Sequence, residues 1–572
     1  MMKNKPAFSF ILHTHLPYVI SHGTWPHGTD WLYEAAAECY IPLLNAFYKL
    51  HSEGISPKVT IDLSPVLTEQ LADDAFVTGL HTYLEERIEA GKLDLKEFTD
   101  TGQPDMLKIA GMWTEYYTGI KKAFIEKYNE NIPGAFRKLE EAGALEIITC
   151  GATHGYLPLL GTDQAVNAQL RQAKQTHKTH FGRDPQGIWL PECAYRPGYN
   201  WKTPVESTIE ARDRVGIETF LSKEKIRYFI VDIDLLKGGE GVDVYLDRFP
   251  GLKALYERME AARVKLPESD KPKTHFRPYW VGGEYGDDDL PVAVFVRDPD
   301  TALVVWSGAH GYPGDGNYLE FHKKRFPNGH RYWKVTSSKA DLADKDLYDP
   351  EIVKARLTDN SDHFVSLVED QLTEAAQNMD VPPFLISPYD TELFGHWWFE
   401  GPLWIEQVLR KLHNNDKVQL VTAGEYLENY PPDEAVSLPE GSWGQGGFHW
   451  IWLNDDTKWT WIHLYKDEQK MIELVKTSAG LASADFDRVL KQLGRELLLE
   501  QASDWQFLIS TFSAKDYAET RFAEHHDRFV KIAALADKIV EGDSITTEEW
   551  NYLTRVEKSD SIFPEIDPSI WS

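Results

Sequence analysis

The chain has 572 residues, more than one hydrophobic core normally supports, so we expect a large domain and at least one further domain. Hydrophobic residues make up 42% of the chain and charged residues 26%, which are the proportions of a folded globular protein. The formal net charge of −30 argues against nucleic acid or an anionic membrane as the main partner, because both bind to concentrated positive charge.

The cysteines and the N-terminal residues indicate where the protein is located. Cys39, Cys150 and Cys193 show no paired spacing, so we expect no disulfide framework. The apolar stretch near the N-terminus meets His13 and His15 too early for a secretory signal, and no apolar run of about 18 residues follows. We therefore expect a cytoplasmic protein with no membrane span.

The first two thirds of the chain alternate short apolar segments with helical ones, a pattern typical of a parallel α/β sheet. Several of the apolar segments are nearly continuous, as expected for strands that are covered on both faces. This repetition favours a closed or nearly closed barrel, with a doubly wound open sheet as the alternative. The predicted strands are Phe8–Leu12, Val59–Leu63, Leu145–Thr149, Gly187–Leu190, Tyr228–Asp232, Val292–Val296, Phe384–Ile386 and Val418–Val421.

Two connections are too long for simple crossovers. Residues from about 66 to 140 are rich in helical pattern and predict a helical insertion, whereas 232–276 opens with the sequence KGGEG and predicts a mobile loop. After about residue 425 the strand pattern fades and helical periodicity replaces it. We therefore expect one domain at 1–425 and a helical domain at 426–572.

Polar residues follow four of the predicted strands directly. His13 and His15 end the first strand, His154 follows the third, Glu192 the fourth, and Asp390 the strand at 384–386. In a parallel barrel the active site is built at the carboxyl ends of the strands, so these side chains are predicted to converge on one site.

The two carboxylates suit the cleavage of glycosidic bonds. An oxocarbenium-like transition state needs one group that protonates the leaving oxygen and another that traps or stabilises the anomeric carbon. Glu192 follows Pro191, which stiffens the turn, and Asp390 precedes the aromatic segment Phe394–Phe399. The alternative is that either residue serves only as a helix cap or as a loop ion-pair partner.

The histidines admit a second interpretation. His13, His15 and His154 could bind zinc, with Glu192 or Asp390 completing the set, in a metal-dependent carbohydrate hydrolase or deacetylase. They could equally form hydrogen bonds with substrate hydroxyls or orient a carboxylate. The HExxH motif of zinc proteases is absent.

Three tryptophans lie beside glycine-rich or polar turns, namely Trp306, Trp443 and Trp452. A tryptophan in such a turn lacks obvious packing partners along the sequence and is a candidate platform for the apolar face of a sugar ring. Burial in the core is the alternative for each of them.

Several motifs together resemble the signature regions of glycoside hydrolase family 57, and within it most resemble the 1,4-α-glucan (glycogen) branching enzymes. The similarity continues through Arg297–Pro299, Val305–Ser307, Gly311–Gly314, 443–461 and Gln501–Trp505, and so covers nearly the whole chain. The four principal segments are His13–Tyr18, Ala152–Pro158, Trp189–Tyr195 and Asp390–Trp398.

The resemblance implies an incomplete (β/α)7 barrel with a helical insertion and an all-helical C-terminal domain that contributes to the substrate cleft. It implies Glu192 as nucleophile and Asp390 as general acid/base, and neither a metal nor another cofactor. Residues that match cleft-lining positions of the family are His13, His15, His154, Arg297, Trp306, Trp443, Trp452 and Asp504.

The implied substrate is an α-1,4-glucan such as amylose, glycogen or a starch-like polymer. A retaining double displacement would cleave it and transfer the chain to a glucan 6-hydroxyl, with the two carboxyl groups about 5–5.5 Å apart. Tyr245 or Tyr256 in the 232–276 loop is the candidate for a tyrosine that covers the site. An α-amylase, a 4-α-glucanotransferase and a non-catalytic glucan-binding protein remain alternatives, and the oligomeric state is not predicted.

Overall fold

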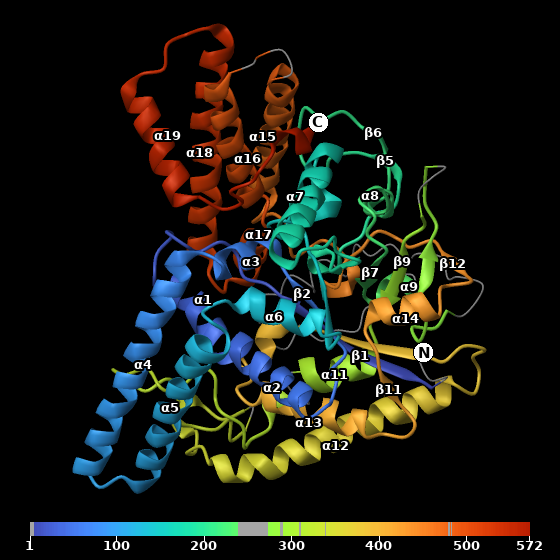
Figure 1. Cartoon of the computed structure of the whole chain (residues 1–572). Helices are drawn as coiled ribbons and strands as arrows, with labels where there is room; N and C mark the ends of the chain where they lie inside the picture. Colours follow the sequence, from blue (N-terminus) through green and yellow to red (C-terminus); the bar gives the residue numbers. More distant parts are fainter. Residues whose placement is uncertain are drawn as a thin grey trace.

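The structure is a computed structural model that describes residues 5–237, 273–286, 290–307, 311–337, 339–478, 481 and 483–572. Short strands lie near the middle of the molecule with helices around them, and a bundle of long helices stands at one end (Figure 1). The helical end is formed by the C-terminal residues, and a separate helical hairpin extends from the opposite side.

The first sheet contains the strand that begins the fold. Its order is β10-β1-β2-β3, and all of its pairings are parallel. A short strand, β11, also pairs with the start of β1. The bounds are β1 Ala7–Thr14, β2 Val59–Leu63, β3 Leu145–Ile148, β10 Phe384–Asp390 and β11 Gln419–Leu420.

The second sheet continues from the first through a parallel bridge between Thr149 and Ile188. Its order is β12-β8-β9-β7-β4, and only the pair β8–β9 is antiparallel. At its far side, the backbone N–H of Asp298 donates to the carbonyl of Ile386 in β10 at 3.4 Å. The bounds are β4 Gly187–Ile188, β7 Tyr228–Val231, β8 Tyr279–Val281, β9 Ala293–Val296 and β12 Ala435–Val436.

Each of the eight predicted strands is present, with changes at the ends. The strand predicted at 384–386 continues to Asp390, and the one predicted at 187–190 ends at Ile188, where the chain turns towards the 3-10 turn Pro191–Cys193. The sequence did not predict β8, β12 or the antiparallel hairpin of β5 (Tyr199–Trp201) and β6 (Arg212–Arg214). These strands have two or three residues each, too few for a periodic pattern of their own.

Helices cover the strands because the strands are apolar on both faces. All eight residues of β1 are buried. The ring of Phe10 packs against Phe364 of α12 and Trp404 of α13, with ring centroids 5.7 and 5.8 Å apart. Such burial on both faces is what the nearly continuous apolar sequence of the strand predicted.

The predicted helical insertion corresponds to four helices between β2 and β3. Asp73 caps the longest of them, α4, by accepting a hydrogen bond from the N–H of Ala75, and α3 and α5 both begin with proline. Helices α4 and α5 pack along each other as the extended hairpin visible in Figure 1. The bounds are α3 Pro65–Leu71, α4 Asp74–Asp100, α5 Pro104–Lys122 and α6 Ile132–Glu141.

The other helices of the strand-containing region connect or flank the strands. They are α1 Thr29–Ala35, α2 Ile41–Ser52, α7 Asp163–Phe181, α8 Ile217–Lys223, α9 Ile233–Lys237, α11 Pro299–Trp306, α12 Pro350–Ala375, α13 Gly401–His413 and α14 Ala423–Asn429.

The C-terminal residues form a helical bundle, as the periodicity predicted. The stripe Phe486, Val489, Leu490, Leu493 and Leu497 of α16 is buried in it. Within the described residues, no helix is both long and apolar enough to cross a membrane. The bundle bounds are α15 Lys458–Ser478, α16 Ala484–Glu500, α17 Asp504–Thr511, α18 Lys515–Glu541 and α19 Thr547–Ser559.

Candidate functional site

The carboxyl ends of three neighbouring strands bring the first polar residues together. His13 of β1 lies opposite Asp390 of β10 on one side and opposite Asp62 of β2 on the other. Because the three strands are parallel and in register, their polar ends meet at one edge of the sheet, as the sequence predicted.

Glu192 reaches the same place from a strained turn after β4. Glu192 and Cys193 have φ values of +60° and +48°, a region that side-chain-bearing residues seldom occupy. The backbone N–H of Trp443 donates to the carbonyl of Glu192 at 3.1 Å, which ties this turn to the loop at 441–447. Strain of this kind persists only where surrounding contacts hold it, and it is common at functional sites.

The carboxylate of Glu192 accepts two hydrogen bonds. The indole Nε1–H of Trp443 lies 2.9 Å from Oε2, and the hydroxyl of Ser503 lies 3.1 Å from Oε1. Burial raises the pKa of Glu192 to about 7, although the hydrogen bonds from Trp443 and Ser503 act in the opposite direction. The group is therefore balanced between its two protonation states near neutral pH.

Asp390 ends β10 and is only partly buried. Burial raises its pKa to about 7; the charge of His13 opposes this change, and the charge of Glu192 adds to it. Two carboxyl groups with raised pKa values at one edge of a sheet are suited to exchanging protons near neutral pH.

The three predicted histidines form one stack. The ring centroids of His13 and His154 lie 5.0 Å apart and those of His15 and His154 4.1 Å apart, while Trp189 covers His13 at 4.7 Å. The Nε2 atoms of His13 and His154 share a hydrogen bond of 3.0 Å.

The outer nitrogens of the stack are also engaged. Nδ1 of His13 contacts Asp62 at 2.9 Å, and Nδ1 of His154 contacts Ser503 at 2.8 Å. His15 lies between Ser64, 2.8 Å from its Nδ1, and Asp504, 3.1 Å from its Nε2. All six ring nitrogens therefore have polar partners, so a metal ion could bind them only by displacing existing hydrogen bonds.

Charge differs among the three rings. Burial lowers the pKa of His13 to about 3, and burial together with the charges of His15 and His13 holds the pKa of His154 well below its usual range. Burial acts on His15 in the same direction, but the charge and hydrogen bond of Asp504 outweigh it and raise the pKa. His13 and His154 are thus neutral, and the His15–Asp504 pair favours the imidazolium form of His15.

Arg297 and Trp306 lie beside Trp443. Arg297 forms an ion pair with Asp232, and its guanidinium lies 5.9 Å from the centre of the Trp443 ring. Trp306 meets Trp443 edge to face, with ring centroids 6.3 Å apart. These residues form a contiguous group around the nucleophile candidate Glu192.

Trp452 packs elsewhere, against Tyr156 at 4.5 Å between ring centroids. Trp306, Trp443 and Trp452 are only 1%, 9% and 1% exposed. In this conformation none of them presents an open ring face, so their use as sugar platforms remains a prediction.

Three residues of the site were not singled out in the sequence. Asp62 lies within the predicted strand Val59–Leu63, Trp189 within the segment Trp189–Tyr195 and Ser503 within the segment Gln501–Trp505. An acidic residue in a strand of otherwise apolar pattern was the available signal for Asp62. No local pattern places Ser503 next to Glu192, which lies 311 positions away.

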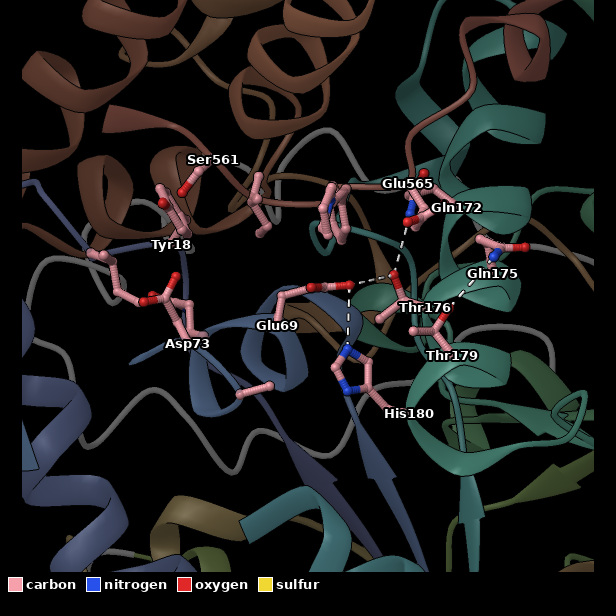
Figure 2. A pocket seen from close by; sticks show the side chains of 16 residues that line it. Tyr18, Glu69, Asp73, Gln172, Gln175, Thr176, Thr179, His180, Ser561 and Glu565 are labelled. Atoms are coloured by element: carbon pink, nitrogen blue, oxygen red, sulfur yellow. Dashed lines mark hydrogen bonds and ion pairs between the residues drawn. The ribbon is translucent and has the colours of Figure 1, made fainter. Parts of the chain in front are cut away.

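Tyr245 and Tyr256, with most of the predicted mobile loop at 232–276, are outside the described residues. A pocket of about 380 Å³ lies between α3, α7 and the segment at 561–565, and its lining residues, drawn in Figure 2, include neither Glu192 nor Asp390.

Known families and proteins match the chain over nearly its full length. The family model described as Glycosyl hydrolase family 57 matches residues 9–346, and the one described as 1,4-alpha-glucan branching enzyme, C-terminal, matches residues 463–571. A 1,4-alpha-glucan branching enzyme of Thermococcus kodakarensis is 40% identical over 562 residues, which cover 98% of this chain and 77% of that protein. The chain therefore belongs to glycosyl hydrolase family 57, as its motifs indicated.

Solved structures agree with this assignment. The crystal structure of the family 57 branching enzyme of Thermococcus kodakaraensis, in complex with glucose, has a TM-score of 0.88 at 38% identity, covering 99% of this chain and 96% of that one. The α-amylase AmyC of Thermotoga maritima has a TM-score of 0.80 at 28% identity and covers 99% of both chains.

Proposed function

We propose that the protein is a 1,4-α-glucan branching enzyme that cleaves α-1,4 links and transfers the released chain to a glucan 6-hydroxyl. The observation that carries this proposal is the C-terminal segment at 463–571, which matches the branching-enzyme C-terminal family. This segment supplies Ser503 to Glu192 and Asp504 to His15, so the helical bundle takes part in the site itself.

In the first step, ionised Glu192 attacks the anomeric carbon as the bond from that carbon to the glycosidic oxygen breaks. Protonated Asp390 donates its proton to the departing oxygen, and a covalent glycosyl-enzyme results. The raised pKa of Asp390 supports its role as the acid, because the group must hold a proton at neutral pH.

In the second step, Asp390 takes the proton of an acceptor 6-hydroxyl as that oxygen attacks the anomeric carbon and releases Glu192. Two displacements give net retention of configuration. Trp443 and Ser503 hold the carboxylate of Glu192 throughout by their hydrogen bonds. We assign substrate contacts to His13, His15, His154, Arg297, Trp306, Trp443, Trp452 and Asp504.

The same proposal extends to architecture and location. The parallel strands β10-β1-β2-β3, continued through β4, β7 and β9, support an incomplete (β/α)7 barrel in the domain at 1–425. The domain at 426–572 is mainly helical from Lys458 onwards, whereas 430–457 is mostly irregular and contains β12, which pairs with β8. We expect the protein to act in the cytoplasm on a soluble α-glucan, without metal.

An assay on amylose tests the proposal. Branching transfer should create α-1,6 links, measured after enzymatic debranching, with little growth in reducing ends. Glu192→Gln should abolish this activity, whereas Glu146→Gln, an equally conservative change at a buried acid of β3, should keep it. Full branching activity in Glu192→Gln would refute the assigned nucleophile. If the wild-type protein produced no new links at all, it would instead be a glucan-binding protein without catalysis.

The similarity to the Thermotoga maritima α-amylase supports hydrolysis as the second candidate. Hydrolysis uses the same pair of carboxylates with water as acceptor. A rapid growth of reducing ends without α-1,6 links would favour it over branching. Redistributed chain lengths without branches would instead indicate a 4-α-glucanotransferase.

A further inference from the structure

Glu192 is connected to Asp62 by an unbroken series of hydrogen bonds. From Asp62 the contacts run to Nδ1 of His13 at 2.9 Å, from Nε2 of His13 to Nε2 of His154 at 3.0 Å, from Nδ1 of His154 to Ser503 at 2.8 Å, and from Ser503 to Glu192 at 3.1 Å. We call this series, Asp62–His13–His154–Ser503–Glu192, the proton chain. It crosses from β2 through β1 to the residue that precedes α17.

The proton chain needs one more hydrogen than its middle members provide. Four contacts require four hydrogens, one in each. A neutral imidazole carries one N–H and a serine carries one O–H, so His13, His154 and Ser503 together supply three. The fourth hydrogen must come from a carboxyl group at one end or from a second proton on an imidazole.

The surroundings decide between these sources. His13 and His154 are buried and their pKa values are lowered, so neither holds a second proton at neutral pH. Asp62 is fully buried, and burial holds its pKa well above the usual range. Its Oδ2 has no hydrogen-bond partner among the described residues, an arrangement that is less costly for a neutral acid than for a buried anion.

We propose that Asp62 shares one proton with Glu192 through His13, His154 and Ser503, so that Asp62 holds the proton whenever Glu192 is ionised for attack. Asp62 is then a positioning residue, because its buried side chain acts on Glu192 through the other members of the proton chain. This inference rests on the nucleophile role proposed for Glu192.

The two positions of the proton give the chain opposite directions. With the proton on Glu192, Nδ1 of His13 and Nε2 of His154 carry the hydrogens, and Ser503 donates to His154. With the proton on Asp62, the hydrogens lie on Nε2 of His13 and Nδ1 of His154, and Ser503 donates to Glu192. No proton leaves the chain in this change, so its total charge stays constant.

The second direction suits the whole reaction cycle. The carboxylate that attacks and the ester that forms are both hydrogen-bond acceptors. Ser503 and Trp443 then donate to Glu192 before, during and after formation of the covalent bond. An arrangement that needs no reorganisation between these states lowers the barrier for attack.

Other titratable groups face the two ends of the proton chain and add to its electrostatics. Burial raises the pKa of the Cys150 and Cys193 thiols, so both stay neutral. The other titratable groups that interact with Asp62 or Glu192, directly or through these neighbours, include His15, Asp504, Asp390, Glu392, Tyr40, Tyr156, Asp232 and Arg297.

Asp62→Asn tests the shared proton with a side chain of the same shape. Oδ1 of Asp62 accepts the backbone N–H of Thr14 at 2.8 Å as well as contacting His13, so the amide oxygen of asparagine should take this position. An amide oxygen can only accept a hydrogen bond, so Nδ1 of His13 must donate to it. This fixes the proton chain in the first direction, in which the fourth hydrogen comes from Glu192. When Glu192 ionises in this variant, three hydrogens remain for four contacts and one hydrogen bond of the proton chain is lost. This loss should raise the pKa of Glu192 by about one unit.

The measurement is the pH dependence of kcat/KM, whose acidic limb reports Glu192 in the free enzyme. In Asp62→Asn this limb should move about one pH unit upwards. Glu146→Gln, the matched change at a buried acid outside the proton chain, should leave the limb in place. An unmoved limb in a folded Asp62→Asn enzyme would overturn the inference.

A second variant separates the proton chain from a general effect of Asp62 on folding. Ser503→Ala removes the link next to Glu192, so adding Asp62→Asn to it should cause no further shift of the limb. An equal shift in both backgrounds would mean that Asp62 acts on Glu192 without the chain.

The histidine tautomers provide a readout that does not depend on branching activity. In ¹⁵N spectra of the histidine-labelled wild-type protein at the pH of maximal activity, His154 should carry its hydrogen on Nδ1. In Asp62→Asn it should carry it on Nε2. Wild-type protein with the hydrogen on Nε2 would refute the inference even if Glu192 proved to be the nucleophile, whereas an active Glu192→Gln enzyme would refute the nucleophile role of Glu192 and leave the tautomer of His154 in the wild-type protein unchanged.

Discussion

The indole N–H of Trp443 donates a 2.9 Å hydrogen bond to Oε2 of Glu192, and the backbone of the same tryptophan holds the carbonyl of that glutamate. The two residues are 251 positions apart. The backbone of Trp443 thus holds the turn that presents the carboxylate, and its side chain fixes the direction of one lone pair, which is the basis of the first prediction.

Trp443→Phe should lower kcat/KM on amylose about 100-fold, as the loss of one oriented donor does in other enzymes. Because the lost bond stabilises the ionised carboxylate, the pKa of Glu192 should also rise, and the acidic limb of the pH profile should move upwards. Trp550→Phe in α19 is the matched control and should change neither quantity. Normal activity in Trp443→Phe would contradict the assigned contact.

The pH profile of the wild-type enzyme should be bell-shaped with its maximum near neutral pH. Attack needs ionised Glu192 and protonated Asp390, and the pKa of each is raised to about 7. The acidic limb of kcat/KM then follows the ionisation of Glu192, and the alkaline limb follows the ionisation of Asp390. Initial rates of branching from pH 5 to 9 give the profile, and a plateau extending to the alkaline end would exclude Asp390 as the acid.

Glu192→Gln should stabilise the protein at pH 8 and not at pH 4. The pKa of Glu192 is about 7 in the folded chain against an ordinary value of 4.5, so the folded state binds more protons between these values. Stability from this group therefore falls as pH rises from about 4.5 to 7, by at most about 3 kcal/mol. Glutamine cannot ionise and removes that loss.

Thermal unfolding of both proteins at the two pH values checks this stability prediction. Glu519→Gln on α18, an exposed acid in the helical bundle, serves as the control and should have the same small effect at both. A Glu192→Gln protein that is less stable than wild type at pH 8 would show that the hydrogen bonds of the carboxylate outweigh its burial.

Gly395→Ala should destabilise the fold by about 3 kcal/mol or more. Gly395 has φ of +118°, and a Cβ at this position would overlap the backbone oxygen of Glu38, which cannot move aside like a flexible side chain. Gly102 has φ of +68° with open space around it, so Gly102→Ala should cost only about 1 kcal/mol. Denaturant unfolding of the two variants measures the difference, and equal losses would contradict the steric argument.

Local sequence was enough to predict eight of the strands, the helical insertion, the helical C-terminal region and the residues that carry the proposed chemistry. The apolar strands at 8–12, 59–63 and 228–232 were predictable because burial on both faces leaves an uninterrupted hydrophobic pattern. Glu192 and Asp390 were found because each lies at or shortly after the carboxyl end of such a strand, where the ends of parallel strands converge.

Tertiary structure alone decided which partners these residues have. Asp62 meets His13 through the register of β1 and β2, and Ser503 and Asp504 reach Glu192 and His15 only because the helical bundle packs on the strand ends. The short strands β8 and β12 likewise exist because neighbouring backbone pairs with them. Periodicity reports which face of an element is buried, whereas contacts across hundreds of residues depend on packing that no local pattern encodes.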